Sequence, residues 1–563
     1  MKVRMVRLIY LITLVAFLFI GCEQKESVSQ GDNLDTIEEI ATDEITATAA
    51  PEAEAITVKY PYEQDLNILE DNYRNYYEIF VYSFYDSDGD GIGDLKGIIS
   101  KLDYIHEMGF NGIWLMPIMP STTYHKYDVT DYYSIDPQYG TLEDFQELLE
   151  ECHKRNIRLI IDFVFNHTSA KHPWFTEAVK YLQTLEEGEE PDLTECPFVG
   201  YYHFVKETNG NNSYHKVGGT DWYYEGVFWD QMPDLALENP ALRKEIEDIT
   251  KYWMDMGVDG FRLDAVKEYY TGDTGKNVEV LTWFSDYVAS IDDEAFVVGE
   301  CWDTSSMISS YYKSGITSIF NYPLAQYNGV IASSVRRLGT ASAKSLAKSI
   351  MDLHQMYGES NPNYIDSPFL SNHDNTRISA QYANDANQMK MAAGILLTQK
   401  GSPFVYYGEE IGMNSMGDKD ENKRLPMNWS ATDLTGMTKA PEKADEVEQK
   451  FPSLEEQLED PLSIVNYYKR ALRIRNENPE IARGEQSIIE EIMTKEVCGF
   501  LNEYEGREIA IIYNLGREAT TVDLKAAGLE QKAISGYLTV DGSEVTLSEN
   551  ILDMPAYSIV ILK

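Results

Sequence analysis

The stretch GFRLDAVKE, Gly260 to Glu268, places an arginine and an aspartate two residues apart inside an apolar run. If residues 259–265 form a strand, Arg262 and Asp264 point to the same face, because side chains alternate along a strand. A charged pair on one face of a short, otherwise buried strand indicates a strand end that opens onto a polar site. The rest of the chain shows how many similar strands accompany it.

Seven further short runs of β-forming residues recur along the chain, and several are continuous and apolar, as in strands buried on both faces. Helical patterns separate them. In TLEDFQELLEECHKRN (141–156), apolar residues recur at helical spacing after Thr141, a suitable N-cap. Eight strands alternating with helices predict an α/β fold, an eight-stranded parallel β/α (TIM) barrel. The expected strands are residues 78–84, 111–117, 157–165, 259–265, 295–300, 317–322, 366–374 and 402–410.

Two gaps interrupt this alternation. The first, between the third and fourth strands, is too long for one crossover connection. Within it, residues 167–225 are rich in Tyr, Gly, Asn and His and predict an inserted irregular domain. The second, 411–460, is an acidic loop. From 481 the pattern changes to alternating strands, which predicts a C-terminal all-β sandwich domain over 481–563. The barrel is then expected over 61–166 and 226–480.

The N-terminus has the features of an export signal. Three basic residues precede an apolar run from Leu8 to Ile20, which is short for a membrane span. The run ends in FIGC, and Gly21 before Cys22 resembles a bacterial lipobox. This implies a signal peptide over 1–21, lipid on Cys22 and an exported protein held on the outer face of the cell membrane by its lipid anchor only. The alternative is a cleaved signal with a chance cysteine. Residues 22–60 predict a disordered acidic tether.

The charge of the chain limits its partners. The formal net charge of the 563 residues is −46. Such a charge repels phosphate backbones, so no nucleic acid is expected among the partners, whereas a neutral substrate and cations remain compatible. The four cysteines after Cys22 are widely spaced without a CxxC pair, so neither a zinc site nor a disulfide framework is indicated. A monomer is expected.

Functional residues of such a barrel lie at the carboxyl ends of its strands. Here those ends supply Asp162, Asn166, His167, Arg262, Asp264, Glu300, His373 and Asp374. Two carboxylates at close range suit retaining glycoside hydrolysis, in which one attacks the anomeric carbon and the other protonates the leaving oxygen and then activates water. Asp264, held ionised by Arg262, is the expected nucleophile. Glu300 follows the apolar FVVG, which should raise its pKa, as a general acid needs. The alternative is a set of ordinary barrel-end ion pairs.

The segments DFVFNH, GFRLDAVKE, VVGE and FLSNHD resemble, in this order, four signature segments of the α-amylase family, glycoside hydrolase family 13. MPDLALENP (232–240) and GSPFVYYGEEIGM (401–413) resemble two more, so that the resemblance covers about residues 75–480. It implies Asp264 as nucleophile, Glu300 as acid/base and Asp374 as a third carboxylate that grips sugar hydroxyls. It also implies a substrate site made of Tyr127 as stacking platform, His125, His167, Arg262, Lys267 and His373.

The member of the family is harder to assign. Exo-acting α-glucosidases resemble the chain in the MPDL and YYGEE regions, but they usually carry Asp-Asn-Gly before the stacking tyrosine. Here those positions are Tyr124, His125 and Lys126, and the Tyr-His pair is like endo-acting α-amylases. We therefore expect cleavage of internal α-1,4-glucosidic bonds in starch and maltooligosaccharides. An exo-acting α-glucosidase or a 4-α-glucanotransferase is the alternative. A non-catalytic glycan-binding lipoprotein is disfavoured, because all three carboxylates are present.

The loop DSDGDGIGD, residues 86–94, alternates carboxylates with glycines, which suits oxygen coordination of Ca²⁺. It is not an EF-hand, because Gly97 stands where an EF-hand needs glutamate. Family members with a similar loop bind a metal there, and an acidic turn without metal is the alternative. A second calcium near Asn166 is left open, since Glu268 stands where many α-amylases have histidine. Ligands of the first are expected from Asp86, Asp88, Asp90, the Ile92 carbonyl and Asp94.

Overall fold

The computed structural model describes residues 62–337 and 340–563. The expected signal peptide, the lipidation residue Cys22 and the tether up to residue 60 lie outside the described residues and stay predictions. Within the described ranges, no helix is both long and apolar enough to cross a membrane.

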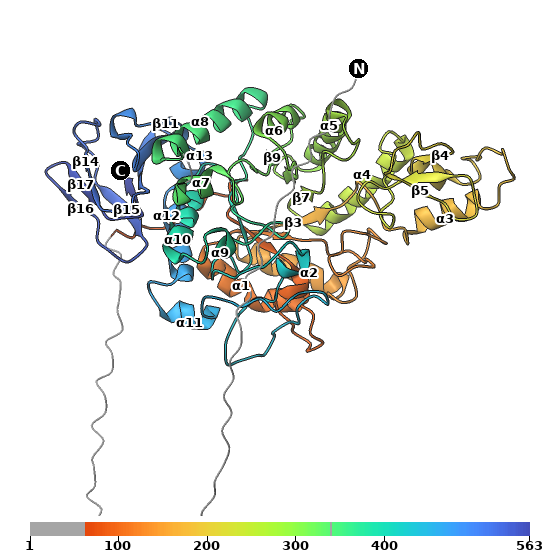
Figure 1. Ribbon diagram of the computed structural model, residues 1–563, viewed down its shortest axis with the longest axis horizontal. Coiled ribbons are helices and arrows are strands. Elements are labelled where there is room, and N and C mark those ends of the chain that lie inside the picture. Colours follow the sequence, from red (N-terminus) through yellow and green to blue (C-terminus); the bar gives the residue numbers. More distant parts are fainter. Residues whose placement is uncertain (1–61, 338–339) are drawn as a thin grey trace, which may run out of the picture. The chain divides into compact units, whose positions relative to one another are not determined.

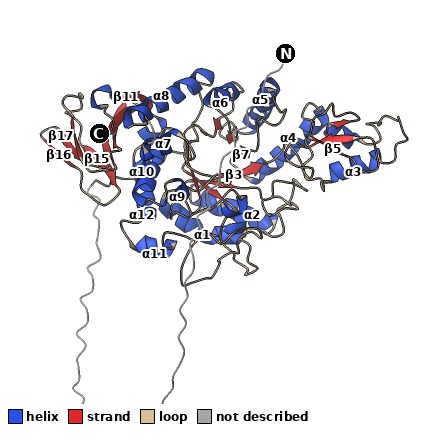
Figure 2. Ribbon diagram, in the orientation of Figure 1, coloured by secondary structure: helices blue, strands red, loops and turns tan. Residues whose placement is uncertain are grey.

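A parallel sheet of seven strands forms the centre of the fold (Figure 1, Figure 2). The strands lie in the order β10-β1-β2-β3-β7-β8-β9. An eighth position closes the ring, because Ser367 bridges Phe320 beside β9 and Phe369 bridges Phe404 of β10, both in parallel. The prediction of a β/α barrel is confirmed. The strands are β1 (Tyr76–Ile79), β2 (Gly112–Leu115), β3 (Arg158–Phe163), β7 (Gly260–Leu263), β8 (Phe296–Gly299), β9 (Ser318–Ile319) and β10 (Phe404–Tyr406).

The observed strands are shorter than expected, and two of them differ in kind. The run expected as a strand over 78–84 ends its strand at Ile79, because Val81–Ser83 forms a 3-10 turn, η1. The seventh expected strand, 366–374, is held by isolated bridges rather than by a regular ladder. One of them contains the hydrogen bond from Asn321 N to Ser367 O, at 2.9 Å, which joins this segment to the residues after β9.

Helices follow most strands, as the alternation predicts. In α2, Thr141 accepts from the N–H of Asp144 and the Asp144 carboxylate accepts from Thr141 in return, a capping box that confirms the expected helix start. The helices of the barrel region are α1 (Leu95–Met108), α2 (Leu142–Lys154), α4 (Pro240–Met256), α5 (Thr274–Ile291), α6 (Ser305–Tyr312), α7 (Val330–Arg336), α8 (Ala343–Ser360), α9 (Ile378–Gln381), α10 (Ala386–Leu397), α11 (Leu454–Glu459), α12 (Ile464–Glu477) and α13 (Pro479–Arg483).

The segment between β3 and α4 is more regular than expected. It contains α3 (Pro173–Leu182), the 3-10 turn η2 (Pro197–Tyr201) and a small antiparallel sheet in the order β4-β6-β5. Its strands are β4 (Phe204–Val205), β5 (Tyr214–Lys216) and β6 (Tyr223–Glu225). Isolated bridges from His167 to Asp234 and from Tyr202 to Leu235 fasten this segment to the chain that leaves β3. The segment therefore lies next to the end of β3, where the chain continues to Asn166 and His167.

The C-terminal region is all-β, as expected. One sheet has the order β11-β12-β13-β18-β15, and the other has the order β14-β17-β16. A separate apolar cluster that includes Val522, Leu552 and Val560 lies between them. The strands are β11 (Glu485–Ile488), β12 (Val497–Tyr504), β13 (Arg507–Asn514), β14 (Thr520–Asp523), β15 (Ile534–Thr539), β16 (Thr546–Ser548), β17 (Ile551–Met554) and β18 (Ser558–Leu562).

Aromatic rings fill the interior of the barrel in layers. Tyr76 stacks on Phe404 at 4.5 Å and on Phe296 at 5.1 Å between ring centroids. Phe320 lies against Phe404 at 4.9 Å and against Trp114 at 5.3 Å. Trp114 in turn meets the ring of His373 edge to face at 5.6 Å. The packed interior thus leads, layer by layer, to one of the expected site residues and gives it a rigid floor.

Candidate active site

Arg262 is the hub of the site. It is 1% exposed, and its Nη1 lies 2.9 Å from Asp162 Oδ1 and 2.7 Å from Asp264 Oδ1, while its Nη2 lies 2.9 Å from Glu300 Oε2. The sheet register explains this gathering: Asp162 of β3 is paired with Arg262 of β7, and Glu300 follows the residue of β8 that is paired with Leu263. The charged pair in GFRLDAVKE therefore belongs to a buried four-residue network at one barrel end.

Glu300 is held in place by three donors. Besides Arg262, the N–H of Ala265 donates to Oε2 at 3.0 Å and the Tyr322 hydroxyl donates to Oε1 at 3.2 Å. Ala265 has a φ of 47°, an unusual value for a residue with a side chain, and this strained turn directs its N–H at Glu300. Burial raises the pKa of Glu300 above its usual range, although Arg262 counteracts that shift. Glu300 is therefore suited to carry a proton, as expected from its apolar approach.

Asp374 is held in the opposite charge state. Burial alone would favour its neutral form, but His373 and Arg424 outweigh burial and hold the pKa of Asp374 below its usual range. His373 Nε2 lies 2.9 Å from Asp374 Oδ2, and Arg424 Nη2 lies 2.7 Å from Oδ1. The site therefore contains one carboxyl group, Glu300, that favours its proton and another, Asp374, that is ionised and can accept hydrogen bonds.

Tyr127 and two histidines complete the wall of the site. The Tyr127 hydroxyl lies 3.0 Å from Asp162 Oδ2 and 2.8 Å from His373 Nε2, and its ring stacks on that of His373. His167 Nε2 lies 3.2 Å from the Tyr127 carbonyl oxygen. Burial lowers the pKa of His125 and of His167 to about 4, so both rings are neutral at pH 7. Neutral imidazoles beside a tyrosine ring suit a ligand rich in hydroxyl groups.

These residues enclose one cavity of 290 Å³. Its lining brings together six of the residues singled out in the sequence: Tyr127, His125, His167, Asp264, Glu300 and Asp374. Arg262 and His373 lie directly behind them in the hydrogen-bond network. Lys267 does not line this cavity, and its Nζ donates to Trp302 O at 3.2 Å and to Asp303 Oδ2 at 3.0 Å. The structure therefore does not place Lys267 with the other expected substrate contacts.

The cavity continues on one side and is bordered by aromatic rings on the other. A cavity of 670 Å³ shares His125, Asp420 and Arg424 with it and includes the half-exposed ring of Trp229. On the Glu300 side, Tyr322 also lines a cavity of 280 Å³ together with the exposed Tyr327. This cavity shares no lining residue with the catalytic cavity, because the stacked rings of Trp302 and Tyr322, 5.3 Å apart, lie between the two. Aromatic side chains thus stand on both sides of the catalytic cavity.

Three residues of the site were missed in the sequence: Glu78, Tyr322 and Arg424. Glu78 lies on β1, with its Oε1 2.6 Å from His373 Nδ1. The signal for Glu78 was a single acidic residue at the start of the run EIFVYSF, and it was not used. Tyr322 lies in the loop after β9, and Arg424 lies in the acidic loop after β10. No local pattern marks either of them, because only the closed ring brings those loops to Glu300 and Asp374.

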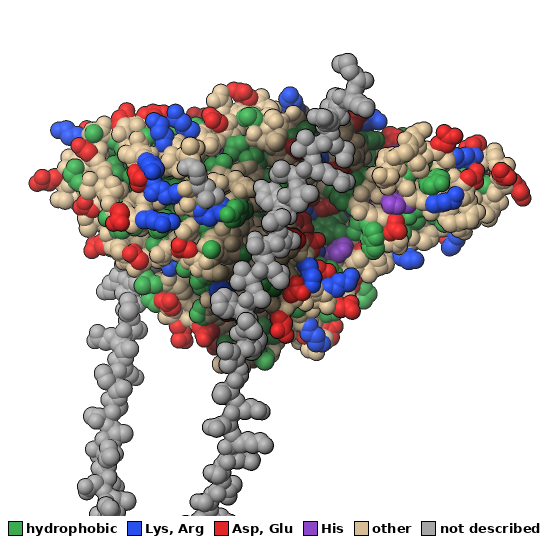
Figure 3. Space-filling view, in the orientation of Figure 1, with side chains coloured by type: hydrophobic (Ala, Val, Ile, Leu, Met, Phe, Trp, Pro, Cys, Tyr) green, Lys and Arg blue, Asp and Glu red, His purple; other side chains and the backbone are tan. Residues whose placement is uncertain are grey.

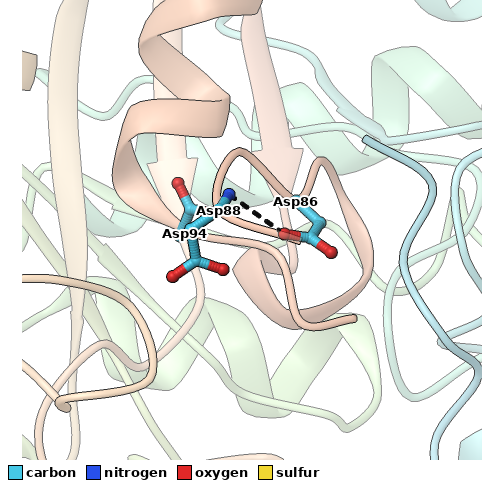
Figure 4. Close-up of side chains that lie close together, drawn as sticks. All are labelled: Asp86, Asp88 and Asp94. Carbon is cyan, nitrogen blue, oxygen red and sulfur yellow. Dashed lines mark hydrogen bonds between the residues drawn. The ribbon is translucent and has the colours of Figure 1, made fainter. Parts of the chain in front are cut away.

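The acidic loop at residues 86–94 gathers three of its expected ligands. Carboxylate oxygens of Asp86, Asp88 and Asp94 lie within 4.8 Å of one another (Figure 4). The Asp90 carboxylate instead accepts from Ile92 N at 2.7 Å. Asp94 also caps α1 through Gly97 N, so the loop geometry is tied to the first barrel helix. Three carboxylates at this spacing are a donor set that fits a hard cation such as Ca²⁺.

Asn166 lies between His167 and Asp234 after the end of β3. Its Nδ2 lies 3.4 Å from Asp234 Oδ1 and 3.2 Å from His167 Nδ1. Its buried Oδ1 has no hydrogen-bond partner among the described residues. Glu268 accepts instead from the Thr271 hydroxyl at 2.8 Å. A second calcium is therefore not assigned.

Comparisons with known proteins agree with this geometry. The family model for the alpha-amylase catalytic domain matches residues 78–484. Alpha-amylase 3 of Dictyoglomus thermophilum is 36% identical over 514 residues, covering 87% of this chain and 93% of that protein. A probable oligo-1,6-glucosidase 2 of Bacillus subtilis is 31% identical over 489 residues, covering 72% and 84%. The solved structure of Eubacterium rectale Amy13B has a TM-score of 0.86 at 45% identity, covering 89% of this chain and 97% of that one.

The extent of these matches identifies the kind of protein. They span the barrel, the segment inserted after β3 and the strand ends that carry Asp264, Glu300 and Asp374. The protein is an enzyme of the glycoside hydrolase type, and the chain belongs to the α-amylase family, glycoside hydrolase family 13.

Proposed function

We propose that the enzyme cleaves internal α-1,4-glucosidic bonds of starch and maltooligosaccharides, with retention of the anomeric configuration. The observation that carries this proposal is that the catalytic cavity continues past Arg424 on one side, where it shares residues with the 670 Å³ cavity, and is bordered beside Glu300 by the exposed ring of Trp302 on the other. A chain can then extend beyond the cleavage point in both directions. A site closed at one end would favour release of terminal sugars instead.

In the first step, Asp264 is the nucleophile and Glu300 the acid. An Asp264 oxygen forms a bond to the anomeric carbon while the bond from that carbon to the glycosidic oxygen breaks. Glu300 gives its proton to the departing oxygen, which leaves as a sugar hydroxyl. The raised pKa of Glu300 supports this role, and the aromatic pair of Tyr322 and Trp302 beside it offers a surface for the leaving sugar.

In the second step, water displaces Asp264 from the anomeric carbon. Glu300, now a carboxylate, takes a proton from a water molecule whose oxygen attacks the anomeric carbon, and the bond to Asp264 breaks. The product keeps its configuration because the carbon has been inverted twice. Asp374, held from behind by His373, binds the hydroxyl groups of the reacting sugar throughout, and Tyr127 forms its stacking surface.

The charge of the site supports a neutral substrate. Four carboxyl groups line the catalytic cavity, from Asp264, Glu300, Asp374 and Asp420, against the single arginine Arg424. Acidic side chains are also spread over the face drawn in Figure 3, in keeping with the net charge of −46. A phosphorylated sugar would meet like charge here, whereas an uncharged glucan does not.

A product time course tests the proposal. The protein from about residue 62 onward is given soluble starch and, separately, maltoheptaose. Endo-cleavage gives a fast fall in iodine staining together with mixed short oligosaccharides, because chains are cut far from their ends. Glucose as the sole early product, with staining slow to fall, would overturn the endo assignment and favour an exo-acting α-glucosidase. Growth of chains longer than maltoheptaose would point to a 4-α-glucanotransferase.

We also propose that Asp86, Asp88 and Asp94 bind Ca²⁺. The support is the convergence of three carboxylates on a loop that caps α1 and faces the acidic loop after β10, where Lys439 Nζ donates to Asp90 O at 2.9 Å. A divalent cation would relieve the repulsion among the three carboxylates. Its role would be structural, because the loop contributes no residue to the lining of the catalytic cavity.

Removal of calcium is expected to destabilise the protein. Dialysis against EDTA should lower Tm, and added Ca²⁺ should restore it, because a ligand at about a hundredfold its Kd stabilises the native state by about 2.7 kcal/mol. Asp88→Asn should abolish this difference in Tm, because it removes one of the three carboxylate ligands. The substitution should otherwise be mild, since Asp88 is exposed and caps no helix. Asp352→Asn, an exposed aspartate on α8, serves as control and should keep it. Equal Tm values in EDTA and Ca²⁺ for the parent would contradict the site.

A further inference from the structure

Glu78 is a buried carboxylate that contacts the active-site residue His373 from the barrel interior. It is 1% exposed on β1, and its Oε1 lies 2.6 Å from His373 Nδ1. The other ring nitrogen of His373, Nε2, lies 2.9 Å from Asp374 Oδ2. The three side chains therefore form a row from the barrel interior to the cavity, in which one imidazole stands between two carboxylates.

An imidazole between two carboxylates is favoured in its charged form, because only the imidazolium donates from both nitrogens. Burial lowers the pKa of His373, but Asp374 and Glu78 outweigh burial and raise it to about 9. Burial likewise raises the pKa of Glu78, and His373 counteracts that shift. The stabilisation of the imidazolium is thus shared between a residue in the cavity and a residue outside it.

The other groups around His373 are already engaged. Arg262 contacts Asp162, and Arg424 contacts Asp374 and also donates from Nε to the His373 carbonyl at 3.1 Å. The Tyr127 hydroxyl lies 2.8 Å from Nε2, and the Trp114 ring meets the imidazole edge to face. Both nearby arginines are therefore directed at carboxylates other than Glu78. Among the described residues, the cationic partner of Glu78 is His373.

We propose that Glu78 is a positioning residue: its buried carboxylate holds His373 as an imidazolium, which fixes Asp374 Oδ2 for the sugar hydroxyls. The inference rests on the proposed role of Asp374 in gripping substrate. It predicts that affinity for sugar depends on the protonation of His373 and that Glu78 determines the pH at which that proton is lost. A residue that only filled space would change affinity by the same factor at every pH.

The link between Glu78 and His373 is tested first without any sugar. Histidine side chains labelled with ¹⁵N are titrated by NMR from about pH 6 to about pH 10. The parent should show a ring titrating near the value of about 9, and His373→Asn should lack it. Glu78→Gln, which keeps the shape of the side chain but removes its charge, should move that titration down by about one to three pH units. An unmoved titration overturns the proposal whether or not an α-glucan binds.

Affinity is tested second, in a Glu300→Gln background, in which turnover is slow enough for binding to be measured. The Kd for maltoheptaose, measured by calorimetry, should stay constant up to about pH 8 and then weaken. With Glu78→Gln added, the break should move down, so that affinity falls about tenfold at pH 8 while staying within about twofold at pH 6. Uniform weakening at all pH values would leave Glu78 a packing residue and overturn the proposal.

Two further results separate the possible failures. If Glu78→Gln does not fold, Glu78→Asp keeps a carboxylate, and its His373 titration should stay within about one pH unit of the parent. A fall as large as that expected for glutamine would then overturn the proposal. If maltoheptaose does not bind the Glu300→Gln protein at any pH, the proposed substrate is wrong, and the role of Glu78 in holding Asp374 for an α-glucan falls with it. The sugar-free titration still decides the Glu78–His373 link.

Discussion

Glu300→Gln lowers kcat on maltoheptaose by about 10²- to 10⁴-fold and leaves the Kd within about threefold, because it removes the transferable proton but keeps the shape of the side chain. The amide oxygen can still accept from Ala265 N while the amide NH2 donates to the Tyr322 hydroxyl oxygen, so the site stays assembled. Steady-state kinetics and calorimetry check both values. Glu294→Gln, an exposed glutamate just before β8, is the matched control and should retain full activity. Undiminished turnover by Glu300→Gln would reject the assignment.

The same variant has a second signature in its pH dependence. In the parent, kcat/KM should fall as pH rises through the pKa of Glu300, because the free enzyme must carry the proton that it donates. Burial raises that pKa, so the fall begins above the range of an exposed glutamate. In Glu300→Gln this alkaline fall should disappear.

Azide should also restore turnover of an activated glycoside by Glu300→Gln, since azide needs no general base, and the product should be an α-glycosyl azide.

Asp264→Asn is expected to lower kcat by roughly 10⁴- to 10⁶-fold, the scale of loss when a nucleophile is removed from an enzyme with a covalent intermediate. An amide can accept from Arg262 Nη1, now 2.7 Å from the carboxylate, but it cannot form a stable bond to the anomeric carbon. Unlike Glu300→Gln, this variant should not form an α-glycosyl azide when azide is added. Stopped assays over hours measure the residual rate.

The control for Asp264→Asn is Asp255→Asn, an exposed aspartate near the end of α4 that pairs with Lys251. It should be fully active. A residual activity of Asp264→Asn within about tenfold of the parent would contradict the role of Asp264 as nucleophile.

The barrel could be predicted from the sequence because strands buried on both faces leave continuous apolar runs between amphipathic helices. The seventh strand shows the limit of that reasoning. Its residues read as a strand and occupy the eighth position of the ring, but isolated bridges hold them there: Asn321 donates to the backbone of Ser367, and its side-chain amide donates to Asp366. Nothing in the run itself reveals that its pairing is reduced to single bridges.

Some residues of the site could likewise be predicted from the sequence and others could not. Asp264, Glu300 and Asp374 could be predicted because each stands at a strand end, a position that is local in sequence. Arg424 could not, because it reaches Asp374 from a loop 50 residues farther along the chain. The family resemblance implied a substrate contact for Lys267, and no pattern in the sequence indicates that its ammonium group donates to Asp303.

The most direct test of the central claim is to trap the intermediate. A 5-fluoro-α-glucosyl fluoride slows both steps, and its fluoride leaves without help from an acid, so a glycosyl-enzyme should accumulate. Peptide mass spectrometry of the inactivated protein should then show one added sugar on the peptide that contains Asp264, and Asp264→Asn should show none. A sugar on Glu300 or Asp374, or turnover of the reagent to a product of inverted configuration with no labelled peptide, would contradict the double-displacement account.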